Sequence, residues 1–360
     1  MKRDNDYQDD GHRELIYWQK QKPHQVWRPR GLLIKKQVVK PCFLQHQMYG
    51  NFWLRSSNSM HNIKSNFIKV KSILTKFLEN SFASSGNFLR PGPKPKFTDL
   101  DVMTLSITAE CMCLDSENYL FHLLRSTYKD DFPYLISRRQ YNDRRKGLFF
   151  QINEIRQAMA NELNELKEVF ALDSMPLEIC KYSRADRNKM GNGNSYYAPD
   201  KGYCASQSKW FFGYKLHGVC SPYGVIQMFD LSQASVHDIN FLKDVSNNMK
   251  NCLIAGDRGY IGKNIKEKLW LDNKICLETP LRSNQKEGKP MLYVLRKVRK
   301  RMETVFSQLC DQFLIQRNYA KSFYGFRTRI LAKITGMTVL QYMNKFITKR
   351  PIGQIKYSFL

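Results

Sequence analysis

Several features that define other classes of protein are missing from this sequence. None of its apolar runs approaches the roughly 18 residues that a transmembrane helix requires, so we expect no membrane partner. The opening residues, from Met1 to Asp6, lack the apolar core of a signal peptide, so we expect no export. These two absences predict a cytoplasmic protein.

Cysteine is present, but it is not arranged as a framework. There are nine cysteines, an odd number, and none belongs to a Cys-x-x-Cys pair. This pattern argues against both a disulfide scaffold and a zinc finger. Cys111 and Cys113 are the only close pair, and we interpret them as two faces of a buried helix rather than as a metal site.

Acidic residues are few compared with basic ones. The chain of 360 residues has 58 Lys and Arg against 32 Asp and Glu, a formal net charge of +26. An excess of this size indicates a polyanionic partner, and nucleic acid is the leading candidate. With 42% apolar residues the chain can still build a sizeable core, as one large domain or two medium ones.

Residues 1–60 are expected to have little fixed structure. Charged residues, Gln, Trp and His follow one another there without a sustained period, and Pro23, Pro29 and Pro41 interrupt any helix. Periodic sequence begins directly after Met60, which makes this residue a candidate alternative start and residues 1–60 a candidate upstream extension.

Residues 61–165 are predicted to form an all-α domain. Apolar residues recur at helical spacing from Ile63. After a hinge rich in Pro and Gly, the spacing Thr98-Asp-Leu-Asp101 indicates a helix start, and we expect this helix to run to about Cys113. A short helix is predicted over Glu117–Leu124.

The third helix after the hinge, a long one, is predicted to begin at Ser137, where Gln140 completes another capping box, and to pack along a stripe that reaches Leu163. Its opening is basic, and we assign four of its residues to DNA binding: Arg138, Arg139, Arg144 and Arg145. Three helices with arginines leading the last are typical of a helix-turn-helix DNA reader. The alternative is a helical packing domain whose arginines are only solvated.

After Leu166 the pattern changes to short strands. We expect strands at Val169–Leu172, Trp210–Cys220, Val225–Leu231, Cys252–Ala255 and Ile275–Glu278, with helices between and after the last three. This order, β-β-β-α-β-α-β-α, is that of a ribonuclease H-like mixed sheet with flanking helices, and we predict such an α/β core over residues 166–350. Residues 181–209, which lie between the first two predicted strands, are interpreted either as a DNA-facing flap or as a tolerated insertion.

Two predicted strands lead into an aspartate, Asp173 after the first and Asp257 after the fourth. A ribonuclease H-like fold puts these strand ends side by side, so we expect the two carboxylates to meet. Glu303 lies on a later predicted helix that can reach across. Asp173, Asp257 and Glu303 are therefore the candidate catalytic and metal-binding residues.

Three carboxylates suit phosphodiester chemistry. Attack on a phosphodiester requires a deprotonated nucleophile, a stabilised leaving oxygen and shielding of the phosphate charge, and two divalent cations supply all three. Mg²⁺ prefers oxygen ligands, and Mn²⁺ can take its place. We therefore predict a catalytic core that depends on Mg²⁺.

The predicted helix around Glu303 is strongly basic. Arg299 precedes the glutamate by four residues and Arg296 by seven, on one helix face, and Lys300 adjoins them. We assign these three cations to the DNA backbone. The opposite face is expected to pack inward through Leu292, Leu295, Val298, Met302, Val305 and Leu309.

Other candidates have a simpler interpretation. Lys215 and His217 lie on one face of a predicted strand and could flank a metal site, but a packed or solvated pair is favoured. The dipeptide His237-Asp238 is interpreted as a helix cap. Trp210 could stack on bases, although an aromatic-rich strand is more often part of a core.

Six segments together resemble bacterial insertion-sequence DDE transposases, specifically the insertion-sequence family nine-eight-two. They are Asp173-Ser-Met-Pro-Leu-Glu-Ile-Cys180, Pro199-Asp-Lys-Gly-Tyr-Cys-Ala-Ser206, Gly213-Tyr-Lys-Leu-His217, Ala234-Ser-Val-His-Asp238, Gly256-Asp-Arg-Gly-Tyr260 and Glu303-Thr-Val-Phe-Ser-Gln-Leu-Cys-Asp-Gln312. The resemblance covers the chain from about Met60 onward. Of the signature Tyr-x-x-Arg-x-x-x-Glu-x-x-x-x-x-x-Lys found in related transposases, only Arg299 and Glu303 are kept.

The resemblance implies a ribonuclease H-like catalytic core that uses Mg²⁺ to cut and rejoin DNA at the terminal inverted repeats of the element. The acidic positions of the family correspond to Asp173, Asp257 and Glu303. The expected partners are double-stranded DNA, as terminal repeats and as target, and further copies of the chain on that DNA. Two alternatives remain: a catalytically inactive, transposase-derived DNA-binding protein, and a metal-dependent nuclease without strand transfer.

Overall fold

The computed structural model describes residues 62–78, 86–166, 168–191, 194–281, 290–357 and 359, all within a compact unit formed by residues 58–360. The predicted extension at residues 1–60 lies outside the described residues. No helix in the described part of the chain is long and apolar enough to cross a membrane.

The first part of the described chain is helical, as predicted. Its helices are α2 (Ile63–Leu78), α3 (Asp99–Cys111), α4 (Glu117–Ser126), α5 (Arg138–Gly147) and α6 (Phe149–Leu163). Both predicted capping boxes are confirmed, Thr98 with Asp101 on α3 and Ser137 with Gln140 on α5.

The predicted third helix is divided, which corrects the expectation of one long helix. Leu148 separates α5 from α6 with φ −94° and ψ 14°, just after Gly147, a residue type that disfavours a helix interior. The break gives the two halves different directions, and the basic half is therefore separate from the apolar half. The end of α3 also differs, because Cys113 lies beyond the helix with a positive φ of 57°.

The second part contains a six-stranded mixed sheet. Its strands are β1 (Val169–Cys180), β2 (Asp200–Cys204), β3 (Lys209–Cys220), β4 (Ile226–Gln233), β5 (Cys252–Ala255) and β6 (Ile275–Glu278). The order is β2-β3-β1-β5-β6, with β4 also paired to β3. β3 is antiparallel to β1, β2 and β4, whereas β1, β5 and β6 are parallel.

The sequence predicted five of these strands. The sixth, β2, lies inside the long segment interpreted as a flap or an insertion, which also contains the 3-10 helix η3 (Tyr182–Arg187). In addition, β1 continues eight residues beyond its predicted end at Leu172, because β3 pairs with it as far as Cys180. Asp173 therefore lies within a strand rather than at its end.

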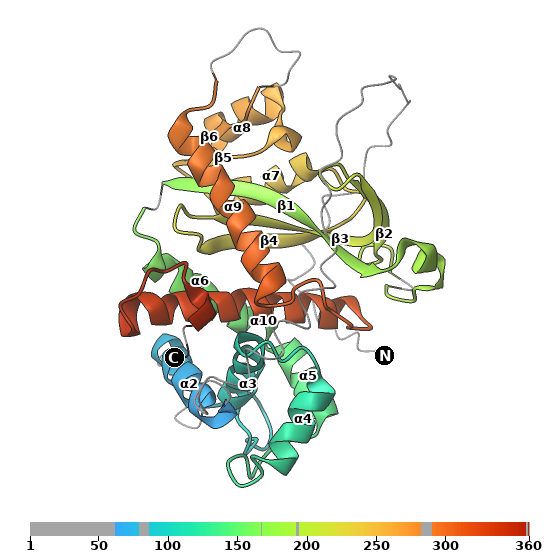
Figure 1. Ribbon diagram of the computed structural model, residues 1–360, viewed down its shortest axis with the longest axis vertical. Coiled ribbons are helices and arrows are strands. Elements are labelled where there is room, and N and C mark those ends of the chain that lie inside the picture. The colour runs from blue at the N-terminus through green and yellow to red at the C-terminus, as the bar shows by residue number, and fades with distance from the viewer. Residues whose placement is uncertain are drawn as a thin grey trace, which may run out of the picture. The chain divides into compact units, whose positions relative to one another are not determined.

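Helices cover both faces of the sheet. The helical elements after β4 are η4 (Asp238–Phe241), α7 (Leu242–Asn248), η5 (Arg258–Tyr260), α8 (Lys263–Asn273), α9 (Tyr293–Asp311), α10 (Phe323–Tyr342), the π-helix η6 (Met343–Ile347) and η7 (Ile355–Tyr357). The side chains of β1 alternate between two clusters: Ala171 packs with residues of α9 and α10, and Leu172 with residues of α7 and α8. This arrangement is compatible with a ribonuclease H-like core (Figure 1).

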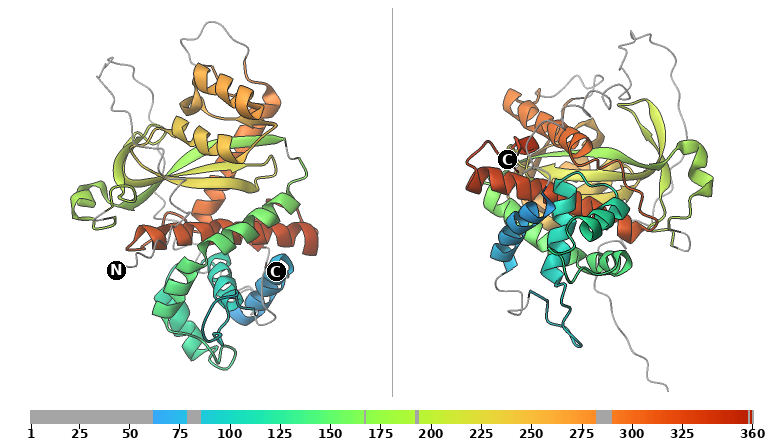
Figure 2. Two further views of the ribbon diagram at one scale, coloured as in Figure 1. Left: turned by 180° about the vertical axis from the view of Figure 1, so that it is seen from behind. Right: turned by 60° about the horizontal axis from the view of Figure 1, so that its bottom comes forward.

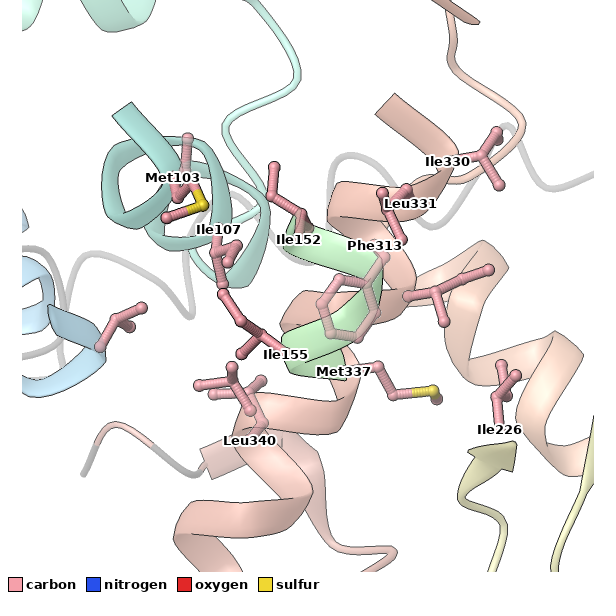
Figure 3. Close-up of a cluster of buried hydrophobic side chains, with 14 of the residues drawn as sticks. Met103, Ile107, Ile152, Ile155, Ile226, Phe313, Ile330, Leu331, Met337 and Leu340 are labelled. Carbon is pink, nitrogen blue, oxygen red and sulfur yellow. The ribbon is translucent and has the colours of Figure 1, made fainter. Parts of the chain in front are cut away.

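Helix α10 connects the two parts of the fold. It runs between the sheet and helices α2 to α5 (Figures 1 and 2) and is buried along almost its whole length. Figure 3 shows Met337 and Leu340 of α10 beside Ile107 of α3 and Ile155 of α6. The main hydrophobic cluster therefore crosses residue 165, where the sequence predicted a domain boundary.

Candidate active site

The register of two parallel strands places Asp173 and Asp257 at corresponding positions. Ala171 of β1 pairs with Ala255 of β5, and each aspartate follows two residues later. Since side chains alternate along a strand, Asp173 lies on the same face as Ala171, the face covered by α9. This register agrees with the expectation that β1 and β5 bring Asp173 and Asp257 to one region.

Local backbone contacts hold both aspartates. Oδ1 of Asp173 accepts a hydrogen bond from the N–H of Ser174 at 2.8 Å. Oδ1 of Asp257 accepts one from the N–H of Gly259, also at 2.8 Å, and thereby caps the 3-10 turn η5. Each bond leaves the second carboxylate oxygen available for another partner.

Helix α9 approaches the sheet beside Asp173. Gly218 is the β3 residue opposite Asp173, and a Cβ at this position would collide with Met302 of α9. The end of the Met302 side chain thus lies over Gly218, and Glu303, the residue after Met302, is near enough for its charge to raise the pKa of Asp173.

The pKa of Asp173 reflects both its burial and the acidic residues near it. Burial raises the pKa of Asp173 to about 7, helped by the negative charges of Asp257 and Glu303, while the Ser174 N–H and the Arg299 guanidinium oppose the rise. Burial and the charge of Asp238 likewise raise the pKa of Asp257, against the Gly259 N–H, Arg299 and His237. The two aspartates therefore share an environment in which added positive charge would be stabilising.

Glu303 is turned toward a cation instead. Its side chain is 51% exposed, and Oε1 lies 3.6 Å from Nη2 of Arg299, one helical turn earlier. Across the described residues, no group of three or more His, Cys, Asp or Glu side chains has the proximity to hold a metal ion. The three predicted acids are thus electrostatic neighbours, but they do not form a ready ligand set in this conformation.

The donor chemistry nevertheless fits a hard cation. Asp173 within β1 and Asp257 just after β5 both offer carboxylate oxygens, and burial, which disfavours the charged form, is the main cause of the raised pKa of each. A divalent cation would stabilise the charged form of both carboxylates, and oxygen ligands are the type that Mg²⁺ prefers.

Two of the four α5 arginines assigned to DNA, both in the last turn of the helix, have internal partners. Arg145 is only 3% exposed, and its Nη2 lies 2.7 Å from Oε1 of Glu117, which corrects its assignment as a DNA contact. Arg144 donates to the fully buried Asp99 at 2.7 Å, a carboxylate that it shares with Arg90 at 3.2 Å. Arg138 and Arg139 are exposed.

The basic face of α9 is mostly exposed. Arg296 and Lys300 are open to solvent, and the Arg296 guanidinium lies 5.8 Å from the ring centroid of Tyr293. Arg299 is the half-buried member, held by Glu303. The inward face agrees with the prediction except at Leu292, which is 70% exposed because it precedes the first turn of the helix.

Lys215 and His217 are engaged within the protein, as the simpler interpretation proposed. Nζ of Lys215 donates to Oδ1 of Asp238 at 3.0 Å and to the Val236 carbonyl at 2.8 Å. His217 is 2% exposed, and its Nε2 lies 2.7 Å from Oγ of Ser232. Burial lowers the pKa of His217 to about 4, so the imidazole is neutral at physiological pH.

Asp238, which the sequence analysis interpreted only as part of a helix cap, also lies beside this site. The cap predicted for this dipeptide is formed by His237, whose Nδ1 accepts from the N–H of Ile239 at 3.2 Å. A Cβ built on Gly259 would lie 3.0 Å from Oδ1 of Asp257 and 3.5 Å from Oδ2 of Asp238. Asp238 therefore flanks the same glycine as Asp257, and its proximity depends on a turn that no sequence spacing reveals.

Comparison with known proteins gives one match. Residues 164–338 match the family model described as the transposase DDE domain, a span that contains Asp173, Asp257 and Glu303. No curated protein and no solved structure matches the chain. The family match supports the interpretation of this protein as a DDE transposase.

Proposed function

We propose that the chain is the transposase of an insertion sequence of family nine-eight-two, which cleaves DNA at terminal inverted repeats and transfers the cut strand to a target. The observation that carries the proposal is the placement of Asp173 and Asp257 two residues beyond the paired Ala171 and Ala255. The family match over residues 164–338 supports it.

In this proposal Asp173 and Asp257 hold Mg²⁺, or Mn²⁺ in its place, and Glu303 completes the acidic set after it leaves Arg299. The bound cations would activate the attacking oxygen and shield the phosphate charge. Asp173 must lose its proton before it can act as a ligand, which its pKa of about 7 permits near neutral pH. Arg299, once released by Glu303, would contact a DNA phosphate.

Double-stranded DNA is the proposed partner. Arg138 and Arg139 at the start of α5, with Arg296 and Lys300 on α9, are the exposed cations assigned to its backbone. We further propose that residues 61–165 form a helix-turn-helix-like reader and residues 166–350 the catalytic domain, that copies of the chain associate on the DNA, and that the protein acts in the cytoplasm.

The test is cleavage of labelled terminal-repeat DNA by Asp257→Asn. The amide keeps the size of the side chain but removes the charge that a hard cation requires. We expect cleavage to fall by at least about a hundredfold, the size of several kcal/mol of lost metal assistance, with DNA binding retained. Asp272→Asn, an exposed change on α8, is the matched control.

Melting temperature, DNA binding and cleavage should be measured on one preparation of each variant. A well-folded Asp257→Asn protein that cuts as fast as the parent would refute the proposal. The alternative of an inactive DNA-binding descendant is favoured by one observation, the contact of Glu303 with Arg299 at 3.6 Å. It predicts that the parent binds terminal-repeat DNA yet cuts none with either Mg²⁺ or Mn²⁺.

A further inference from the structure

Three aromatic side chains are exposed together at the end of the sheet where β2 and β3 pair. Tyr182 is 40% exposed, Tyr203 49% and Trp210 57%. We call these three residues the aromatic patch. The neighbouring Phe211 and Phe212 are buried, so the prediction that this aromatic strand belongs to the core holds for them but not for Trp210.

The patch is built on paired backbone. Tyr203 of β2 and Trp210 of β3 are direct cross-strand partners, with ring centroids 5.3 Å apart and planes inclined at 55°. The ring of Tyr182, in η3, lies 6.5 Å from that of Trp210 at 51°. Because the three rings are tilted rather than stacked face to face, they do not cover one another's faces.

Positive charge surrounds the aromatic patch. Nζ of Lys201 lies 5.6 Å from the ring centroid of Tyr182. Arg184 and Arg187 are exposed in the same short helix η3 as Tyr182. Asp186 pairs with Lys201 at 3.2 Å, but 44% of the Lys201 side chain is still exposed. Residues 181–209 as a whole include six basic and only two acidic residues.

Exposed aromatic faces beside cations suit nucleic acid whose bases are unpaired. In a continuous duplex each base is covered by its neighbours, so a protein ring can stack only on a base that has left the stack. The cations would contact the phosphates of the same strand. We propose that the aromatic patch binds unpaired nucleotides of the DNA substrate.

The patch is remote from the acids. Gly218 pairs with Asp173, and Trp210 lies eight residues earlier on β3, a separation of roughly 26 Å along the strand. Figures 1 and 2 show η3 at the end of the sheet opposite to β6 and α8. The proposal rests on the proposed function, since the partner is the DNA that the acids would cut, but it assigns the patch no part in the chemical step.

The experiment compares the full-length parent with Trp210→Ala, Trp210→Phe and Trp270→Ala. Trp270, on α8, is 52% exposed and provides a matched control at a distant site. Affinities for labelled oligothymidylate and for a duplex of equal length would be measured by fluorescence anisotropy without divalent cation. Tyr203→Ala is a second variant in the aromatic patch. The melting temperature of each variant would show whether it is folded.

We expect Trp210→Ala to bind oligothymidylate at least about fivefold more weakly, the lower end of what one stacked base contributes. Trp210→Phe, which keeps a ring, should stay within about twofold of the parent, as should Trp270→Ala, and duplex affinity should hardly change. If folded Trp210→Ala and Tyr203→Ala proteins bind oligothymidylate as tightly as the parent, the proposal is wrong. The same result is expected if the aromatic patch binds another protein instead. An equal loss for single strand and duplex would also overturn the proposal.

Cleavage of terminal-repeat DNA by the parent is scored separately. A parent that cuts DNA while its oligothymidylate binding ignores Trp210 refutes only the patch. If the parent cuts no DNA but binds oligothymidylate through Trp210, the proposed transposition chemistry is refuted. The proposal that the aromatic patch binds unpaired nucleotides is then still supported.

Discussion

Replacing Lys333 by methionine should destabilise the protein by about 3–5 kcal/mol, because it leaves a buried carboxylate without its main partner. Lys333 on α10 is 1% exposed, and its Nζ lies 2.5 Å from Oε2 of Glu110 on α3, itself 3% exposed. The same ammonium donates to the Phe313 carbonyl at 2.6 Å. Arg329 is a weaker partner of Glu110, with its Nε 3.9 Å from Oε1.

The expected destabilisation corresponds to a melting temperature lower on the order of 10 °C for a chain of this size. Lys64→Met is the matched control: Nζ of Lys64 is also 2.5 Å from a carboxylate, that of Asp131, but the lysine side chain is 54% exposed. An exposed pair contributes only about 0–1 kcal/mol. Urea unfolding followed by tryptophan fluorescence would measure both variants.

A double variant separates the effect of charge from the effect of packing. Combining Glu110→Gln with Lys333→Met removes the unpaired carboxylate, so the double variant should be more stable than Lys333→Met alone. If Lys333→Met lowers the free energy of unfolding no more than Lys64→Met does, the reasoning from burial is wrong. The ion pair between Lys333 and Glu110 then does not stabilise the packing of α10 on α3.

Three further predictions concern charge. Because burial raises the pKa of Asp173 to about 7, the folded metal-free protein keeps a proton that the unfolded chain releases above about pH 4. Its melting temperature should therefore fall between about pH 4 and 7, and Asp173→Asn should show a smaller fall; equal slopes for the two proteins would contradict this. Replacing Arg138 and Arg139 by alanine should weaken DNA binding and reduce its salt dependence by roughly one unit of slope for each phosphate that the protein no longer neutralises. Arg145→Ala should instead lower the melting temperature, since it leaves Glu117 without its 2.7 Å partner, and weaker DNA binding at unchanged stability would refute that distinction.

The sequence by itself determined the parts of this fold that depend on neighbours along the chain. Thr98 and Ser137 cap their helices because capping needs only a side-chain oxygen and an acid or amide three residues later. Strands β5 and β6 lie where their apolar runs predicted. The candidate acids Asp173 and Asp257 were found the same way, since each follows such a run and the order of elements makes their strands neighbours.

Only the tertiary structure decided which charged and aromatic side chains are available. Arg138 and Arg145 look alike in sequence, but one is exposed and the other is buried against Glu117, because the partner comes from another helix. Trp210 and Phe211 are adjacent, yet a strand sends them to opposite faces, and pairing with β2 leaves only the tryptophan open. Likewise, Asp238 reaches the site of Asp257 through the turn at Gly259. Burial and pairing of this kind arise from interactions between distant segments, and so they depend on the packed fold rather than on local spacing.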